Sequence, residues 1–186
     1  MLDREVLILA VHENIEHLGV EALDVVNLRV GPADVPADGP ISEPFSALAE
    51  LKQQGLIRHL GISGATGAQL TEAQTIAPVV TVQNLYNVAQ RADDALVERC
   101  AQENIAFAPF FPLGGFTPLQ SEELSAVARE LEASAQQVAL AWLLQRSPTI
   151  VLIPGTSSVE HLRENVAAGS LRLPDETVER LDKIGA

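Results

Sequence analysis

The stretch that decides the fold runs from Ile57 to Gln83 and reads IRHLGISGATGAQLTEAQTIAPVVTVQ. A short apolar run over 57–63 is followed by small residues, by a helical pattern and by a second β-branched run over 79–83. Strand, helix and strand in this order form a parallel unit, because two parallel strands need a long crossover between them. The stretch therefore predicts an α/β fold with a parallel sheet.

The same alternation continues in both directions from this unit. We expect five strands, each followed by a helix, over residues 23–30, 57–63, 79–83, part of 105–115, and 149–154. No long linker and no shift in composition divides the chain, so we expect one domain over residues 1–186. A closed barrel of eight such units typically takes about 250 residues, and this chain has fewer units and fewer residues.

Composition and charge exclude several classes of protein. The net charge of −13 argues against nucleic acid and anionic membranes as partners, because Lys and Arg are needed to neutralise a phosphate backbone. The lone Cys100 cannot form an internal disulfide, and no apolar run is long enough to span a membrane, so we expect a cytoplasmic protein. His12 and His17 lie on different faces of a helical pattern, and no metal site is expected.

The junction TIVLIPGTSSVEHLREN, residues 149–165, is the first candidate binding site. Ser157 and Glu160 have the spacing of a capping box, which accounts for the serine structurally. A helix that begins after a strand also presents free N–H groups and partial positive charge to an anion. Gly155 would allow close approach of such an anion, and His161 could add a donor. Both a plain helix cap and a phosphate site fit this junction.

Three other motifs follow the expected strands. GISGATGAQL, residues 61–70, lacks the spacing of a Rossmann fingerprint and favours a tight turn with Thr66 as the N-cap. VQNLYN, residues 82–87, could orient a flat ring or simply close a loop. The loop after residue 109 could form a stacking platform or a hydrophobic plug with its three aromatic residues, Phe110, Phe111 and Phe116.

In this order, the motifs resemble the C-terminal portion of an aldo-keto reductase, from the helix after strand three to the C-terminus. The resemblance rests on four segments: LGVEALDVVNLRV (18–30), GLIRHLGISGAT (55–66), VVTVQNLYNVAQR (79–91) and ALAWLLQRSPTIVLIPGTSSVEHLRENVAA (139–168). It implies a partial (β/α)8 TIM barrel with about five βα units, corresponding to strands four to eight. It also implies binding of NADP(H) at the carboxyl-terminal rim and reduction of a small-molecule carbonyl substrate.

The resemblance assigns cofactor roles residue by residue. It implies that Ser63 and Gln83 contact the nicotinamide carboxamide, with Gly64 where the family usually has Asn. It implies that the ring of Phe110 stacks on the nicotinamide and that Leu113 lies in the loop over the pyrophosphate. The remaining positions match the segment around the adenosine 2′-phosphate and adenine: Gly155, where Lys is common, Thr156, Ser157, His161, where Arg is frequent, Glu164 and Asn165.

The catalytic set of the family is not matched. The resemblance implies a Tyr acid with a Lys, an Asp and a His, and it places Arg29 at the His position. The sequence has one tyrosine, Tyr86, which lies in a different βα unit from the family's catalytic Tyr, and two lysines, Lys52 inside a helix and Lys183 near the C-terminus. Arg29 can hold an anion or polarise a carbonyl, but it cannot replace a proton donor. We therefore expect a truncated reductase that is inactive alone.

Two alternatives remain open. The chain could be a non-catalytic NADP(H)-binding or regulatory module, or a half barrel that assembles with another copy or a complementing chain. An open barrel segment leaves unpaired strand edges and apolar surface, which favours self-association.

Overall fold

The computed structural model describes residues 3–32, 38–115, 119 and 121–185, which form two compact units. The first unit comprises Met1–Asn84 and Asn104–Ala106, and the second comprises Leu85–Glu103 and Phe107–Ala186. The expectation of a single incomplete barrel domain stays a prediction. Phe116 lies outside the described residues.

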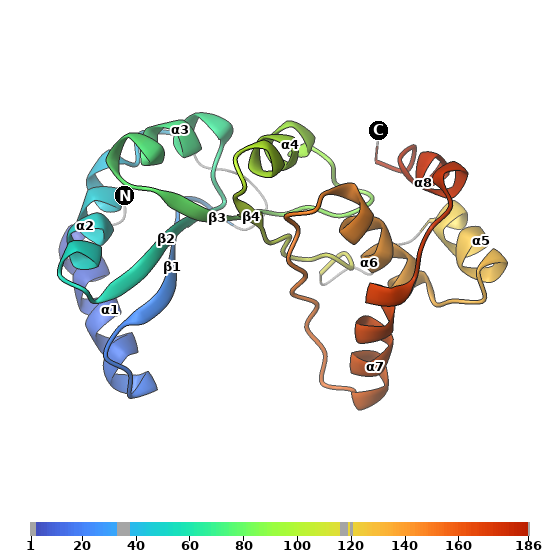
Figure 1. Cartoon of the computed structure of the whole chain (residues 1–186), viewed down its shortest axis with the longest axis horizontal. Coiled ribbons are helices and arrows are strands. Elements are labelled where there is room, and N and C mark those ends of the chain that lie inside the picture. Colours follow the sequence, from blue (N-terminus) through green and yellow to red (C-terminus); the bar gives the residue numbers. More distant parts are fainter. Residues whose placement is uncertain (1–2, 33–37, 116–118, 120, 186) are drawn as a thin grey trace. The chain divides into compact units, whose positions relative to one another are not determined.

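The first unit alternates helices and strands along the chain (Figure 1). Its elements are α1 (Arg4–Leu18), β1 (Leu23–Arg29), α2 (Ser42–Gln53), β2 (Ile57–Ser63), α3 (Gly67–Ile76) and β3 (Val79–Gln83). Strands β1 and β2 pair in parallel, as do β2 and β3, and with the two-residue strand β4 (Ala106–Phe107) the sheet order is β1-β2-β3-β4. The parallel α/β fold predicted from residues 57–83 is confirmed.

Local sequence accounts for the helix ends in this unit. The Asp3 carboxylate accepts a hydrogen bond from the Glu5 N–H and begins α1, while Gly19, at φ 65°, ends it in the left-handed conformation that glycine adopts without strain. Thr66 and Gln69 form a reciprocal capping box at the start of α3. The predicted N-cap role of Thr66 is confirmed.

The helices of this unit lie on one side of strands β1–β3 (Figure 1). On the sheet, Asn27 lies beside Gly61 and Gly61 beside Thr81, and one pleat further on Arg29, Ser63 and Gln83 form a second row. Since side chains alternate between faces along a strand, the two rows lie on the same face. Val25, on that face, is exposed, whereas Leu28, on the opposite face, is buried.

The second unit is built mainly of helices. Its elements are α4 (Asp94–Gln102), the end of β4 (Ala106–Phe107), α5 (Glu122–Glu130), α6 (Ala135–Arg146), α7 (Val159–Ala167), the short 3-10 helix η1 (Ala168–Ser170) and α8 (Asp175–Leu181). The core contains three large aromatic side chains with almost no exposed surface. The Tyr86 ring stacks on Trp142 at 6.0 Å and meets Phe107 edge-on at 5.7 Å.

The predicted fifth strand, residues 149–154, is wrong. Only Ile150 forms a bridge, with Phe107, through hydrogen bonds from the Phe107 N–H to the Thr149 carbonyl and from the Val151 N–H to the Phe107 carbonyl, both 2.9 Å long. A strand needs a run of ladder hydrogen bonds, and its partner β4 is itself only two residues long. The described chain thus has four strands, and residues 151–156 have no regular secondary structure.

No described helix has the length and apolar character needed to cross a membrane. Among the described residues, no group of three or more His, Cys, Asp and Glu side chains is placed to hold a metal ion.

Candidate functional site

In the first unit, three candidate residues meet at the carboxyl ends of the strands. Arg29, Ser63 and Gln83 are the last residues of β1, β2 and β3 and lie in register with one another. Ser63 is buried, whereas Arg29 is exposed and its Nε donates to the Gly31 carbonyl at 3.3 Å. Active sites of parallel α/β folds lie at the carboxyl-terminal ends of the strands. The sheet therefore places these residues where an active site is expected.

The turn after β2 is fixed by the backbone and by Asn84. The Gly64 N–H donates to the Gln83 carbonyl at 3.0 Å, and Gly64 has φ 62°, a conformation that disfavours any residue with a Cβ. Asn84 is buried and hydrogen-bonds both the N–H and the carbonyl of Ala65. Asn84 therefore closes a loop, which is one of the two roles left open for the VQNLYN motif.

In the second unit, the loop at 110–115 is held in a strained, compact conformation. Phe110 forms a parallel bridge with Leu85, and its ring meets Phe111 edge-on at 5.4 Å. Phe111 has φ 53°, and Asn87 Nδ2 donates to its carbonyl at 3.0 Å. A Cβ on Gly115 would lie 2.7 Å from the Phe111 ring, so glycine is required where the loop folds onto that ring.

The junction before α7 differs from the prediction by one residue. Ser158, not Ser157, is the N-cap, and its Oγ accepts the His161 N–H at 3.3 Å. Thr156 Oγ1 accepts the Ser158 N–H at 3.0 Å, which sets the turn so that the helix starts at Val159. The residue three positions after Ser158 is His161 rather than Glu or Gln, so the predicted Ser157–Glu160 capping box is absent.

Two adjoining pockets bring several candidate residues together. One, of about 340 Å³, is lined by Leu113, Gly115, Gly155, His161 and residues of α5 and α6, among them Gln136. The other, of about 430 Å³, is largely apolar and is lined by Phe110, Phe111, Pro112, Ile153, Pro154 and the shared residues Leu113, Gly115 and Gly155. Both volumes lie in the range of ligand pockets.

The pockets separate the predicted cofactor residues into two groups. Phe110, Leu113, Gly155 and His161 line them, whereas Thr156, Ser157, Glu164 and Asn165 are not among the lining residues. Thr156 and Ser157 are exposed in the turn, and Glu164 and Asn165 are half-buried on α7.

Sequence reasoning missed Gln136, Leu119 and Ile153 as pocket residues. The capping box formed by Ser134 and Gln137 places Gln136 in the first turn of α6. That signal marks the start of the helix, but it does not say which pocket the first turn borders.

Gly155 is one of the three residues that line both pockets, and no described part of the chain requires a glycine there. Its φ is not positive, and a Cβ added to it would meet no atom within 4 Å. Open space at the backbone beside a helix N-terminus, with His161 in the first turn of that helix, fits a bound anion approaching this backbone.

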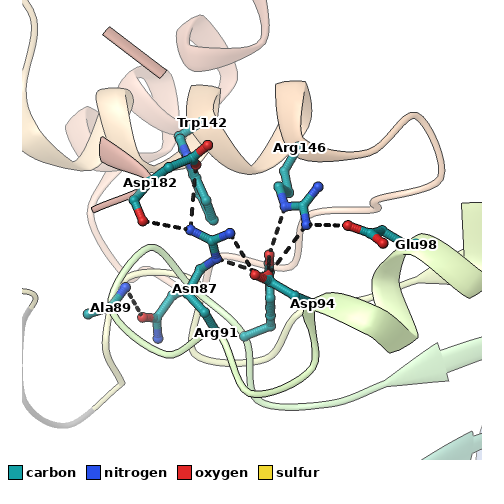
Figure 2. A network of polar contacts seen from close by, with 9 residues as sticks. Asn87, Ala89, Arg91, Asp94, Glu98, Trp142, Arg146 and Asp182 are labelled. Carbon is teal, nitrogen blue, oxygen red and sulfur yellow. Dashed lines mark hydrogen bonds and ion pairs between the residues drawn. The ribbon is translucent and has the colours of Figure 1, made fainter. Parts of the chain in front are cut away.

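Tyr86 is buried in a polar network with Asp94 and Arg146, two residues that Figure 2 labels. Its hydroxyl donates to Asp94 at 2.6 Å and accepts from Arg146 Nε at 3.2 Å. Burial, followed by the hydrogen bond to Asp94, raises the pKa of Tyr86 to about 12. This tyrosine holds its proton at neutral pH and has no exposed surface through which to deliver it.

Figure 2 shows how the same network joins three parts of the second unit: the start of α4 at Asp94, helix α6 at Trp142 and Arg146, and the end of α8 at Asp182. Arg91 donates to both oxygens of Asp94 at 2.9 and 2.7 Å and to the Asp182 carbonyl at 3.1 Å, and its guanidinium lies 5.1 Å from the Trp142 ring centre. Burial works to raise the pKa of Asp94, and hydrogen bonds from Arg91 and Tyr86 outweigh it, so the pKa is lowered. The network is structural.

Neither lysine supplies the missing catalytic partner. Lys52 Nζ, at the end of α2, donates to the Arg58 carbonyl, and Lys183 borders an open pocket with Ser121 and Glu122. Among the described residues, no tyrosine–lysine pair exists.

Comparison with known proteins identifies the class in which such a parallel α/β chain occurs. The chain matches the aldo/keto reductase family over residues 2–186. It is 58% identical over 177 residues to pyridoxine 4-dehydrogenase of Escherichia coli, covering 94% of this chain and 62% of that protein. It is 41% identical to an uncharacterized oxidoreductase of Schizosaccharomyces pombe, covering 92% of this chain and 55% of that protein.

Solved structures give the same result. A thermostable aldo-keto reductase, Tm1743, determined with the inhibitor epalrestat, has a TM-score of 0.86 and 32% identity, covering 99% of this chain and 68% of that one. An aldo/keto reductase from Klebsiella pneumoniae, in complex with NADP and acetate, has a TM-score of 0.81, and the match covers 97% of this chain and 66% of that one. At 24% sequence identity, this match supports the fold alone.

The chain belongs to the aldo/keto reductase family. It is an oxidoreductase-family chain similar to pyridoxine 4-dehydrogenase, with four strands and their helices that match a portion of the family's TIM barrel. It spans about 62% of the length of the E. coli relative. The prediction that this portion is the C-terminal one is not confirmed by the matches.

Proposed function

We propose that this chain binds NADP(H) and forms the cofactor-binding part of an aldo/keto reductase similar to pyridoxine 4-dehydrogenase. The observation that carries the proposal is the pair of adjoining pockets in which Phe110, Leu113, Gly155 and His161 meet beside the start of α7. When bound, the nicotinamide would supply the hydride exchanged with a carbonyl carbon.

The residues present would hold an extended dinucleotide by complementary surfaces. The apolar pocket walled by Phe110 and Ile153 suits a flat ring, and the polar pocket with Gln136 and His161 suits an anionic group. The N-terminus of α7 adds partial positive charge to a chain whose net charge is −13. Thr156, Ser157, Glu164 and Asn165 stay proposed contacts to the adenosine end. Within the first unit by itself, the Ser63 hydroxyl and the Gln83 amide stay proposed hydrogen-bonding groups for a carboxamide.

The substrate class proposed follows from the relative's name and from family chemistry. Dehydrogenation of pyridoxine at position 4 corresponds, in reverse, to reduction of an aldehyde on the same ring. Arg29, exposed at the strand ends, would face the substrate as an anion- or carbonyl-binding group. No described side chain supplies the proton, since Tyr86 is sealed in its network, so we expect the chain alone to lack turnover.

Exposed apolar side chains favour a second arrangement, in which the chain works as part of an assembly. Val159, Leu162 and Val166 lie on one side of α7 and are 52–71% exposed. Apolar side chains at this spacing mark a helix face that packs against another element. A complementing chain or a second copy would cover this face.

A titration of the chain with NADPH, followed by nicotinamide fluorescence, tests the binding proposal. Gly155→Lys should tighten NADPH binding about tenfold through a charge-assisted hydrogen bond to the 2′-phosphate, with little effect on NADH, because the site is open and unstrained. Gly169→Lys, which adds the same charge at another open glycine, is the matched control.

Absence of NADPH binding at millimolar concentration would refute the proposal. Carbonyl-dependent oxidation of NADPH by this chain would instead overturn the claim that it lacks a proton donor.

A further inference from the structure

The Gln83 side chain, at the end of β3, is hydrogen-bonded by a side chain from β1, two strands away in the sheet. Asn27 Nδ2, on β1, donates to Gln83 Oε1, on β3, at 3.1 Å. Strand β2 lies between them in the sheet. Both side chains are partly buried, so the contact is shielded from competing water.

The reach across β2 depends on a missing side chain. Gly61 is the β2 residue paired with Asn27 on one side and with Thr81 on the other. A Cβ on Gly61 would lie 2.0 Å from Asn27 Oδ1 and 2.7 Å from the Thr81 carbonyl oxygen. The φ of Gly61 is not positive, so glycine is needed here for space and not for backbone conformation. The Asn27 amide lies where a β2 side chain would otherwise be.

This arrangement leaves one polar atom unsatisfied. Within the described part of the chain, Asn27 Oδ1 is buried and has no hydrogen-bond partner. An unpaired buried acceptor costs about 1–3 kcal/mol, and a leucine of similar shape would avoid that cost. An asparagine kept at this position despite the cost indicates that its Nδ2 group, which donates to Gln83, has a function.

We propose that Asn27 is a positioning residue that fixes the orientation of the Gln83 amide for the nicotinamide carboxamide. Because the Asn27 amide donates to Gln83 Oε1, the oxygen of Gln83 is held toward β1 and Nε2 is left as the free end. That end donates to the carbonyl oxygen of the carboxamide. The inference rests on the proposed binding of NADP(H). It adds Asn27 and Gly61 to the residues that determine how the cofactor binds.

The test compares two ligands that differ only in the nicotinamide. NADPH and 2′-phospho-ADP-ribose are titrated against the full chain and the variants Asn27→Leu, Gln83→Leu and the double variant. Asn27→Leu should weaken NADPH two- to tenfold, the effect of one hydrogen bond, and leave 2′-phospho-ADP-ribose unchanged. The double variant should lose no more than Gln83→Leu alone, since the two side chains act through one contact. Asn14→Leu, on the exposed side of α1, is the matched control.

Equal weakening of both ligands by Asn27→Leu, or no weakening of NADPH, would overturn the inference. A measurement without ligand separates it from the proposed function: the side-chain NH2 signals of Gln83 in an NMR spectrum should shift on Asn27→Leu. Unchanged signals would refute the contact even if NADPH binds. If the signals shift and neither ligand binds to the unaltered chain, the contact stands, but the proposed function and the role of Asn27 in it both fail.

Discussion

Helices α6 and α7 follow one another in the second unit, and both carry apolar residues at helical spacing, yet only one is covered. Six residues of α6, from Val138 to Leu143, are buried, whereas no residue of α7 is. The α6 stripe packs around Trp142 and the Tyr86 network, while Leu162 and its neighbours on α7 face outward. Apolar residues thus stabilise the unit in one helix and offer a surface in the other.

The largest expected effect comes from the covered helix. Trp142→Ala removes a side chain with no exposed surface, its stacking on Tyr86 and its hydrogen bond to Asp182 Oδ1 at 2.8 Å. We expect a loss of about 3–5 kcal/mol in the free energy of unfolding, measured by urea denaturation.

The contrasting change on α7 is Leu162→Ala. Because this side chain is 52% exposed, we expect a loss below about 0.5 kcal/mol and weaker self-association in sedimentation. Equal destabilisation by the two substitutions would show that α7 is covered in solution.

The second effect is a pH dependence of stability that comes from Tyr86, the ring that stacks on Trp142 of α6. The pKa of Tyr86 is raised to about 12 in the folded chain, above its ordinary value near 10. A raised pKa stabilises the fold fully below the unfolded value, so this contribution is lost as the pH rises from about 10 to about 12. Since Tyr86 is the only tyrosine, its ionisation can be followed directly by ultraviolet absorbance.

Tyr86→Phe is the matched variant for this prediction. It keeps the ring stacking but removes the hydroxyl that bonds Asp94 and Arg146, and it should cost about 1–3 kcal/mol at neutral pH. Its stability should also change less between pH 10 and 12. A Tyr86 titration near pH 10 in the folded chain would contradict the burial that distinguishes this region.

The last effect is local and lies at the start of the uncovered helix. Ser158→Ala should cost about 1 kcal/mol of local helix stability, because Ser158 Oγ accepts the His161 N–H, whereas Ser157→Ala should cost almost nothing. Amide hydrogen exchange of residues in α7 measures both. Loss of protection in the Ser157 variant alone would restore the cap predicted from the sequence.

Elements that depend on local chemistry were predictable from the sequence. Strands β2 and β3 match the expected bounds, and Thr66 caps α3 as expected. The sequence could not show that residues 149–154 lack a strand partner. An apolar β-branched run indicates side chains that suit a sheet, but it does not indicate whether a neighbouring strand is long enough to pair with it. Similarly, the choice between Ser157 and Ser158 depended on the Thr156 hydroxyl, which sets the preceding turn.

By itself, the sequence determined the parallel α/β class and the family, because alternation of strands and helices and the order of motifs are properties of the chain. Only the tertiary structure decided which motif residues meet. It buried Tyr86 against Trp142, gathered Leu113, Gly155 and His161 around one pocket, and passed the Asn27 amide over Gly61 to Gln83. Contacts of this kind join residues far apart in the chain, such as Tyr86 and Arg146 at 60 positions, and no local pattern specifies the register that brings such side chains within hydrogen-bonding distance.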